Sequence, residues 1–189
     1  RDLVGDAYTY FQNDNLDSAK CLIDLAIRDS VASKDGQTWY FRGFIYKKIY
    51  IVNEKQNAQS PARMIAFESF KHSLKIDTSV SGIGETKKNL KYLASTFFNS
   101  AKSNLDSAIS HQDSVYCKMA LENYSFYKEC CVLININSSN DLEFLKALAS
   151  VYSHLFDKTK SIQFFNNAKD IYSNILKIDP NDILTNYNL

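Results

Sequence analysis

The chain has 189 residues, enough for one domain of ordinary size or a short array of repeats. Only five Gly and two Pro residues occur, too few for the closely spaced turns of an all-β sandwich or barrel. Basic and acidic residues nearly balance at 22 and 21, so the overall charge does not imply a polyelectrolyte partner. Because hydrophobic residues make up 45% of a chain with so few turn residues, the composition predicts an all-α fold.

The N-terminal half reads as helices separated by short polar breaks. The chain begins almost inside a helix, and polar breaks are predicted at residues 13–15 and 33–36. Between these breaks, apolar residues recur at the spacing of one helix face at Leu22, Ile23, Ala26 and Ile27. Pro61 is expected in the first turn of a helix that runs to about residue 76, because proline is tolerated there.

The C-terminal half carries the clearest helical periodicity. After a break predicted at 79–84, apolar residues follow the i, i+3, i+4 pattern from Leu90 to Ile109, within a helix over residues 85–111. A similar stripe runs from Leu142 to Phe156, after a polar break at 137–140. Asp182 is a suitable N-cap for a helix that starts near Ile183.

Internal repetition is the next feature of the sequence. The segment LKYLASTF at 90–97 matches LKALASVY at 145–152 in five of eight positions. A small Ala is followed four residues later by a bulky apolar residue in four places, and such a pair allows close approach of two helices. The pairs are Ala19/Ile23, Ala66/Phe70, Ala120/Tyr124 and Ala168/Tyr172.

Together these residues resemble the tetratricopeptide repeat (TPR) family, whose signature is W-x2-L-G-x2-Y, then A-x3-F, then P. Trp39, Gly43 and Tyr46 match the first-helix part, Pro180 matches the closing proline, and Thr78 stands at the equivalent place. Weaker first-helix matches are Leu3, Ala7 and Tyr10, then Leu90, Leu93, Ala94 and Phe97, then Leu145, Leu148, Ala149 and Tyr152.

The resemblance implies a right-handed α-solenoid of antiparallel helix pairs, a TPR-like superhelix of about four repeats. These would form a single repeat domain over 1–189, with repeats at roughly 1–35, 36–80, 84–138 and 140–180. Residues 181–189 would start a further repeat, with Leu189 at its first-helix leucine position. We therefore expect the chain to be a segment of a longer protein.

The repeats depart from the family in length. In the family, the closing aromatic of the first helix lies nine residues before the Ala of the second helix. Here only Tyr10 and Ala19 keep this spacing. The later spacings are 20, 23 and 16 residues. The extra residues either lengthen the turn inside each repeat, where they could serve binding, or lengthen the helices themselves.

In this family the first helices line a concave groove that holds a peptide or a partner helix. Lys88, Lys91 and Asn99 could clamp a carboxylate there, although they could equally be a solvated helix face. Carried over residue by residue, the groove positions are Val4, Tyr8, Tyr40, Phe44, Lys47, Lys88, Lys91, Ser95, Asn99, Lys146 and Ser150.

The sequence offers no catalytic motif, metal site or cofactor site. His72, His111 and His154 have no metal-binding spacing, and the glycine-containing segment 81–88 lacks the G-K-[ST] ending of a phosphate loop. The four cysteines show no zinc or disulfide framework, so free thiols acting as small core residues are expected. They are Cys21, Cys117, Cys130 and Cys131.

Charge is distributed unevenly along the chain. Residues 37–102 carry 11 basic and 4 acidic side chains, whereas residues 1–36 and 103–189 each have a net charge of −3. The basic middle favours an acidic protein or peptide partner. An aromatic and basic cluster at 39–50 also suggests stacking on a nucleic acid, but the near-zero overall charge argues against that partner.

The sequence thus predicts a non-catalytic protein–protein interaction scaffold that binds a peptide or helix on the concave first-helix surface. The alternative is an envelope-associated helical module that binds carbohydrate or an assembly partner through the lengthened turns, such as 51–60. Free thiols favour a reducing compartment, whereas the lengthened repeats resemble bacterial cell-envelope TPR proteins and favour the periplasm. No apolar run is long enough for a membrane span.

Overall fold

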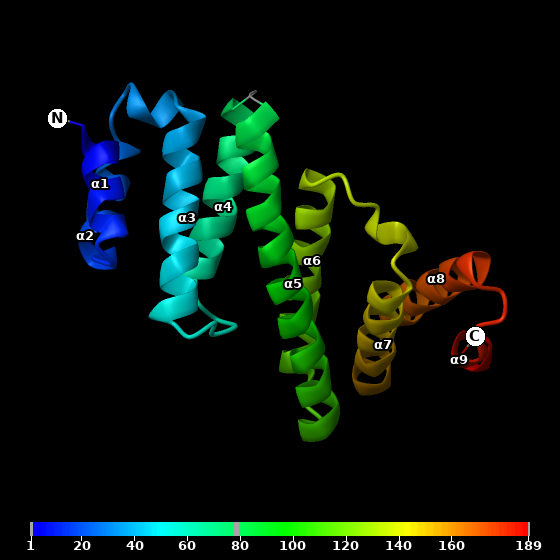
Figure 1. The fold of residues 1–189 in the computed structure, drawn as a ribbon. Coiled ribbons are helices and arrows are strands. Elements are labelled where there is room, and N and C mark those ends of the chain that lie inside the picture. Colours follow the sequence, from blue (N-terminus) through cyan, green and yellow to red (C-terminus); the bar gives the residue numbers. More distant parts are fainter. Residues whose placement is uncertain (1, 78–79, 189) are drawn as a thin grey trace. The chain divides into compact units, whose positions relative to one another are not determined.

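The computed structural model describes residues 2–77 and 80–188, and over these residues it contains helices and turns but no strand (Figure 1). The predicted all-α fold is therefore confirmed for the described chain. Two short 3-10 segments, η1 (Ala32–Lys34) and η2 (Ser138–Asn140), occupy two of the predicted breaks. The α-helices are α1 (Leu3–Gln12), α2 (Leu16–Ala26), α3 (Gly36–Val52), α4 (Pro61–Ile76), α5 (Val80–His111), α6 (Ser114–Leu133), α7 (Leu142–Thr159), α8 (Ile162–Ile178) and α9 (Ile183–Asn188).

Helix starts follow the capping residues that the sequence supplies. Ser60 accepts a hydrogen bond from the backbone N–H of Arg63, and Pro61 then opens α4 as predicted. Asp182 accepts from the N–H of Thr185 at 2.9 Å, which confirms the predicted cap of α9. Each cap satisfies an N–H group that has no partner inside its own helix.

The break predicted at 79–84 is wrong for residues 80–84, which belong to α5. Thr78 and residue 79 lie outside the described residues. Two glycines suggested a loop, but a glycine inside a helix costs only about 1 kcal/mol relative to alanine. Burial of the apolar side chain of Leu90 in the turns that follow offsets this cost.

The chain divides into two compact units, Arg1–Leu93 and Ala94–Leu189, with the boundary inside α5. In the first unit, α1 packs on α2, α2 on α3, and α3 on α4. Helices α3 and α4 run side by side in opposite directions and are joined at one end by residues 53–60 (Figure 1). In the second unit, α6 packs on α7 and α7 on α8.

The small residues at predicted repeat positions sit where helices meet. A Cβ added to Gly43 of α3 would lie 2.7 Å from a ring carbon of Phe70 in α4, so only glycine allows this approach. All eight residues of the four Ala/bulky pairs are buried. The first-helix residues Leu90, Leu93 and Phe97 are also fully buried, whereas Tyr10 of the first predicted repeat is exposed.

Aromatic contacts build the core of the second unit. Phe98 of α5 packs edge-on against Tyr124 of α6, with ring centroids 5.9 Å apart. Tyr124 in turn packs against Phe144 of α7 at 5.6 Å. Tyr127 of α6 also donates a 2.6 Å hydrogen bond to Asp141, the residue that caps α7. The core of this unit therefore links three successive helices.

The extra residues of the later repeats lie mainly in the helices. Helix α5 has 32 residues and α7 has 18, and only residues 112–113 and 160–161 separate them from the helices that follow. The connection from α3 to α4, residues 53–60, is the one lengthened turn among these three. Of the two explanations for the long spacings, longer helices therefore hold for α5 and α7.

The cysteines are free thiols, and three of them are buried as expected. Cys21 is the exception: it is exposed on α2, so its assignment to the core is wrong. It precedes the buried stripe residue Ile23 by two positions, which places it on a different side of the helix. None of the described helices combines the length and apolar character that a membrane span requires.

Candidate functional site

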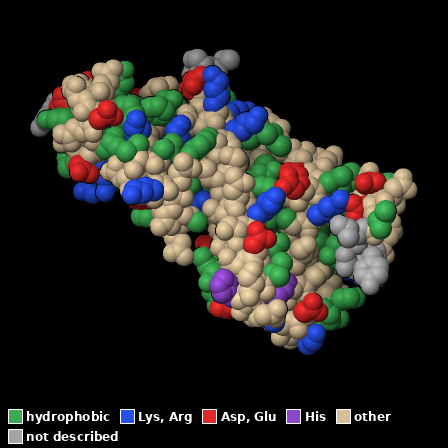
Figure 2. Space-filling view, turned by 60° about the horizontal axis from the view of Figure 1, so that its bottom comes forward, with side chains coloured by type: hydrophobic (Ala, Val, Ile, Leu, Met, Phe, Trp, Pro, Cys, Tyr) green, Lys and Arg blue, Asp and Glu red, His purple; other side chains and the backbone are tan. Residues whose placement is uncertain are grey.

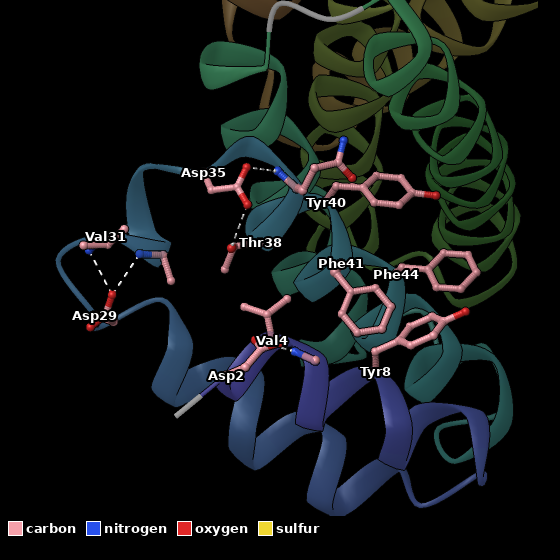
Figure 3. Close-up of a pocket in the computed structure, with 13 residues that line it drawn as sticks. Asp2, Val4, Tyr8, Asp29, Val31, Asp35, Thr38, Tyr40, Phe41 and Phe44 are labelled. Carbon is pink, nitrogen blue, oxygen red and sulfur yellow. Dashed lines mark hydrogen bonds between the residues drawn. The ribbon is translucent and has the colours of Figure 1, made fainter.

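A pocket of about 850 Å³ lies in the first unit, between α1, the segment 29–35 and the N-terminal half of α3 (Figure 3). Four of the predicted groove residues line it, namely Val4, Tyr8, Tyr40 and Phe44. The sequence thus identified residues of α1 and α3 that the fold brings together. We call this site the N-terminal pocket.

One wall of the N-terminal pocket is aromatic. The ring centroid of Tyr8 on α1 lies 5.4 Å from that of Phe41 on α3, and the Tyr40 and Phe44 rings stack at 6.1 Å. Phe11 supports the wall from behind, 5.3 Å from Phe44. The Tyr8 side chain is still 48% exposed, so a ligand could bury a large part of this ring.

Carboxylates lie on the opposite side of the N-terminal pocket, away from the rings (Figure 3). Asp29 accepts hydrogen bonds from the backbone N–H groups of Val31 and Ala32, both at 2.9 Å. Asp35 caps α3 by accepting from Gln37, and Asp2 caps α1. The N–H groups of Ala32 and then Val31 lower the pKa of Asp29, so this carboxylate is charged at neutral pH.

Lys47, the next predicted groove residue, is half-buried beside the aromatic wall. Its ammonium group lies 5.1 Å from the centre of the Phe44 ring and 5.4 Å from that of Tyr92 on α5. It donates a hydrogen bond to the side chain of Asn89, and burial lowers its pKa. Lys47 therefore connects α3 to the start of α5, and its donors are partly used within the fold.

The remaining predicted groove residues are less closely grouped. Lys88 is exposed and pairs with Glu85 one turn earlier on α5, and Lys91 is exposed. Lys146 pairs with the buried carboxylate of Asp182. Four of the predicted groove residues belong to the second unit, namely Ser95, Asn99, Lys146 and Ser150. On the face shown in Figure 2, basic and acidic side chains are interspersed rather than gathered into one field of a single sign.

The acidic side of the N-terminal pocket and the ring of Phe41 were not predicted as parts of the site. Asp35 falls in the polar break predicted at 33–36 and Asp29 lies just before it, and both hold the loop between α2 and α3 through capping hydrogen bonds. An aspartate two or three residues before a helical turn is a recognisable capping signal. Phe41 lies one position from Tyr40, and only the packing of α1 on α3 reveals that both face the pocket.

Beneath the aromatic wall, a polar network joins α2, α3 and α4. Arg42 donates to Asp24 at 2.8 Å and to the hydroxyl of Ser69 at 2.8 Å. Tyr46 donates to the other oxygen of Asp24 at 2.5 Å, and its pKa is raised by burial and by this hydrogen bond. The network orients α3, which carries more of the pocket residues than any other helix.

Two of the three histidines pack on aromatic rings. His72 packs on Trp39 with ring centroids 4.1 Å apart, and His111 packs on Tyr116 at 5.5 Å. Over residues 2–77 and 80–188, no group of three His, Cys, Asp or Glu residues is arranged to hold a metal ion. Comparison of the sequence with protein-family models and with curated proteins gave no match.

Proposed function

We propose that the protein is a non-catalytic interaction scaffold that binds a peptide or helix of a partner protein on the surface formed by its first helices. The observation that carries this proposal is the N-terminal pocket, where Tyr8, Tyr40 and Phe44 of two first helices line about 850 Å³ of space. An open pocket walled by aromatic rings suits the anchor side chain of a partner, since such anchors supply most of the binding energy of an interface.

We further propose that the helix pairs are divergent TPR repeats of a right-handed α-solenoid. The close approach of Gly43 to Phe70 and the burial of all four Ala/bulky pairs support this assignment. A helix pair in such an array buries its apolar faces only by stacking on its neighbours. In this arrangement one surface for a ligand is formed by α1, α3 and the start of α5. Beyond the aromatic wall, this surface continues with Lys47 and Lys91.

A non-catalytic role fits the state of the acidic groups in the N-terminal pocket. A carboxyl group that acts as a general acid needs a pKa raised towards neutrality. Backbone N–H groups lower the pKa of Asp29 instead, and Asp35 and Asp2 accept capping hydrogen bonds. These carboxylates therefore stabilise the backbone around the pocket and give the pocket negative charge.

Selection of a random linear peptide display library on the whole chain tests the proposal. We expect enriched peptides whose affinity falls at least about tenfold in Tyr8→Ser, because Tyr8 is the most exposed ring of the aromatic wall. Tyr10→Ser is the matched control, since Tyr10 is similarly exposed on the same helix but does not line the pocket. Peptides that bind both variants equally would contradict docking at this pocket.

A second candidate function rests on a polar pocket of about 620 Å³ at the turn edge of the first unit. Amide and carboxylate side chains line it, including Asn13, Asp17 and Asn53, together with Lys48. Such groups suit the hydroxyls of a carbohydrate, and Asn53 belongs to the lengthened turn. On a glycan array, this function requires binding that is lost in Asn53→Ala and kept in Tyr8→Ser.

A further inference from the structure

The N-terminal pocket combines an apolar wall with charge of a single sign. Asp2, Asp29 and Asp35 line it, and no Lys or Arg is present among the described residues of its lining. The sequence around it, residues 1–36, carries a net charge of −3. An apolar ligand that also carries positive charge would complement both sides of this pocket.

The carboxylates keep acceptor positions for a ligand although they are used in the fold. Asp35 accepts from the N–H of Gln37 at one oxygen and from the hydroxyl of Thr38, at 3.5 Å, at the other. Both backbone hydrogen bonds to Asp29 go to Oδ1, and an ionised carboxylate offers about four acceptor positions. The same bonds fix the direction of the carboxylate, so a ligand does not have to order it on binding. Figure 3 shows Asp29 and Asp35 across the pocket from Tyr8 and Phe44, so one ligand could reach both sides.

We propose that the N-terminal pocket recognises a basic and apolar peptide segment of the partner, with a bulky apolar side chain among the rings and neighbouring Lys or Arg residues at Asp29 and at Asp35. This inference rests on the proposed scaffold function and specifies its ligand. At this pocket it replaces the acidic partner expected from the basic middle of the chain. The lysines that suggested an acidic partner lie on the α5 side, and Lys88 there is already paired with Glu85.

The test uses the peptides enriched from the display library and a pair of charge-removing variants. Asp29→Asn combined with Asp35→Asn removes two charges while asparagine keeps a capping oxygen. Asp113→Asn is the matched control, because Asp113 caps α6 through the same kind of bond, a 2.9 Å contact from the N–H of Val115. Circular dichroism melting of each variant shows that the fold is retained.

We expect the enriched sequences to place Lys or Arg next to Leu, Phe or Trp. Their affinity should fall about three- to tenfold in the Asp29→Asn/Asp35→Asn variant, fall with added salt, and stay unchanged in Asp113→Asn. Replacing the Lys and Arg residues of the best peptide by Glu should abolish binding.

Two results would overturn this inference. One is a set of acidic peptides that bind in a Tyr8-dependent way, and the other is an affinity that the double variant leaves unchanged. In either case the scaffold proposal would stand with another ligand. Peptides whose binding does not depend on Tyr8 would overturn both proposals. A dimer of the chain in sedimentation that Tyr8→Ser dissociates would show that a second copy fills the pocket, and would also overturn this inference.

Discussion

Gly43 of α3 lies directly against the ring of Phe70 in α4, and an ideal Cβ at Gly43 would come within 2.7 Å of the ring. We predict that Gly43→Ala lowers the free energy of unfolding by about 1–3 kcal/mol, because the methyl group overpacks a fully buried contact. Thermal or urea unfolding measures this change. The intrinsic helix preference of alanine opposes the loss only in part.

Gly84 provides the matched control for this prediction. It lies in α5, and a Cβ placed there would meet nothing within 4 Å. Gly84→Ala should therefore leave stability unchanged or raise it by up to about 1 kcal/mol. If both alanine variants behaved alike, the close packing of α3 on α4 would not be what requires glycine at position 43.

Asp24 is the shared acceptor for Arg42 and Tyr46 beneath the aromatic wall. We expect Asp24→Ala to destabilise the protein by about 1–3 kcal/mol, because it leaves two largely buried donors without this partner. A double-mutant cycle with Tyr46→Phe, followed by urea unfolding, measures the coupling. Additive effects of the two changes would show that the hydrogen bond contributes nothing to stability.

Arg63 is almost completely buried and anchors the lengthened turn 53–60. Its guanidinium donates to the carbonyl oxygen of Ala58 and lies over the ring of Tyr50. We predict that Arg63→Met removes amide hydrogen-exchange protection in residues 53–60 while α3 stays protected. Lys55→Met, an exposed change in the same turn, should not do so. Unaltered exchange in the Arg63 variant would mean that the turn is held in another way.

Asp182 contributes stability that depends on pH. The hydrogen bond from Lys146, followed by those from Thr185, lowers the pKa of Asp182 to about 2. An unfolded aspartate has a pKa of about 3.9, so the stabilisation is present above about pH 4 and is lost as the pH falls towards about 2. The advantage of the wild type over Asp182→Asn in melting temperature should shrink over that interval. A constant difference would contradict this assignment.

The sequence predicted the helices best where a local signal and a buried stripe agree. Pro61 and Asp182 mark helix starts correctly, and the Ala/bulky pairs fall in the core. The start of α5 was missed because Gly82 and Gly84 signal a loop locally, whereas tertiary burial of Leu90 decides in favour of helix.

The candidate site was predictable in part. The family spacing pointed to Tyr8, Tyr40 and Phe44, and these residues line one pocket. The aspartates opposite them were not predicted, because their place depends on how the 29–35 segment folds back over α1 and α3. The net charge of a sequence segment also counts every lysine alike, whereas the structure shows that Lys88 is paired with Glu85.

Chemical-shift mapping of an enriched peptide on the isotope-labelled chain tests the central claim most directly. The proposed docking predicts that the largest amide shifts fall in α1 around Tyr8, in the loop from Asp29 to Asp35, and in α3 up to Phe44. The lining of the N-terminal pocket would then be the binding site. Shifts confined to the turn-edge residues Asn13 and Asn53, or to the second unit, would contradict it.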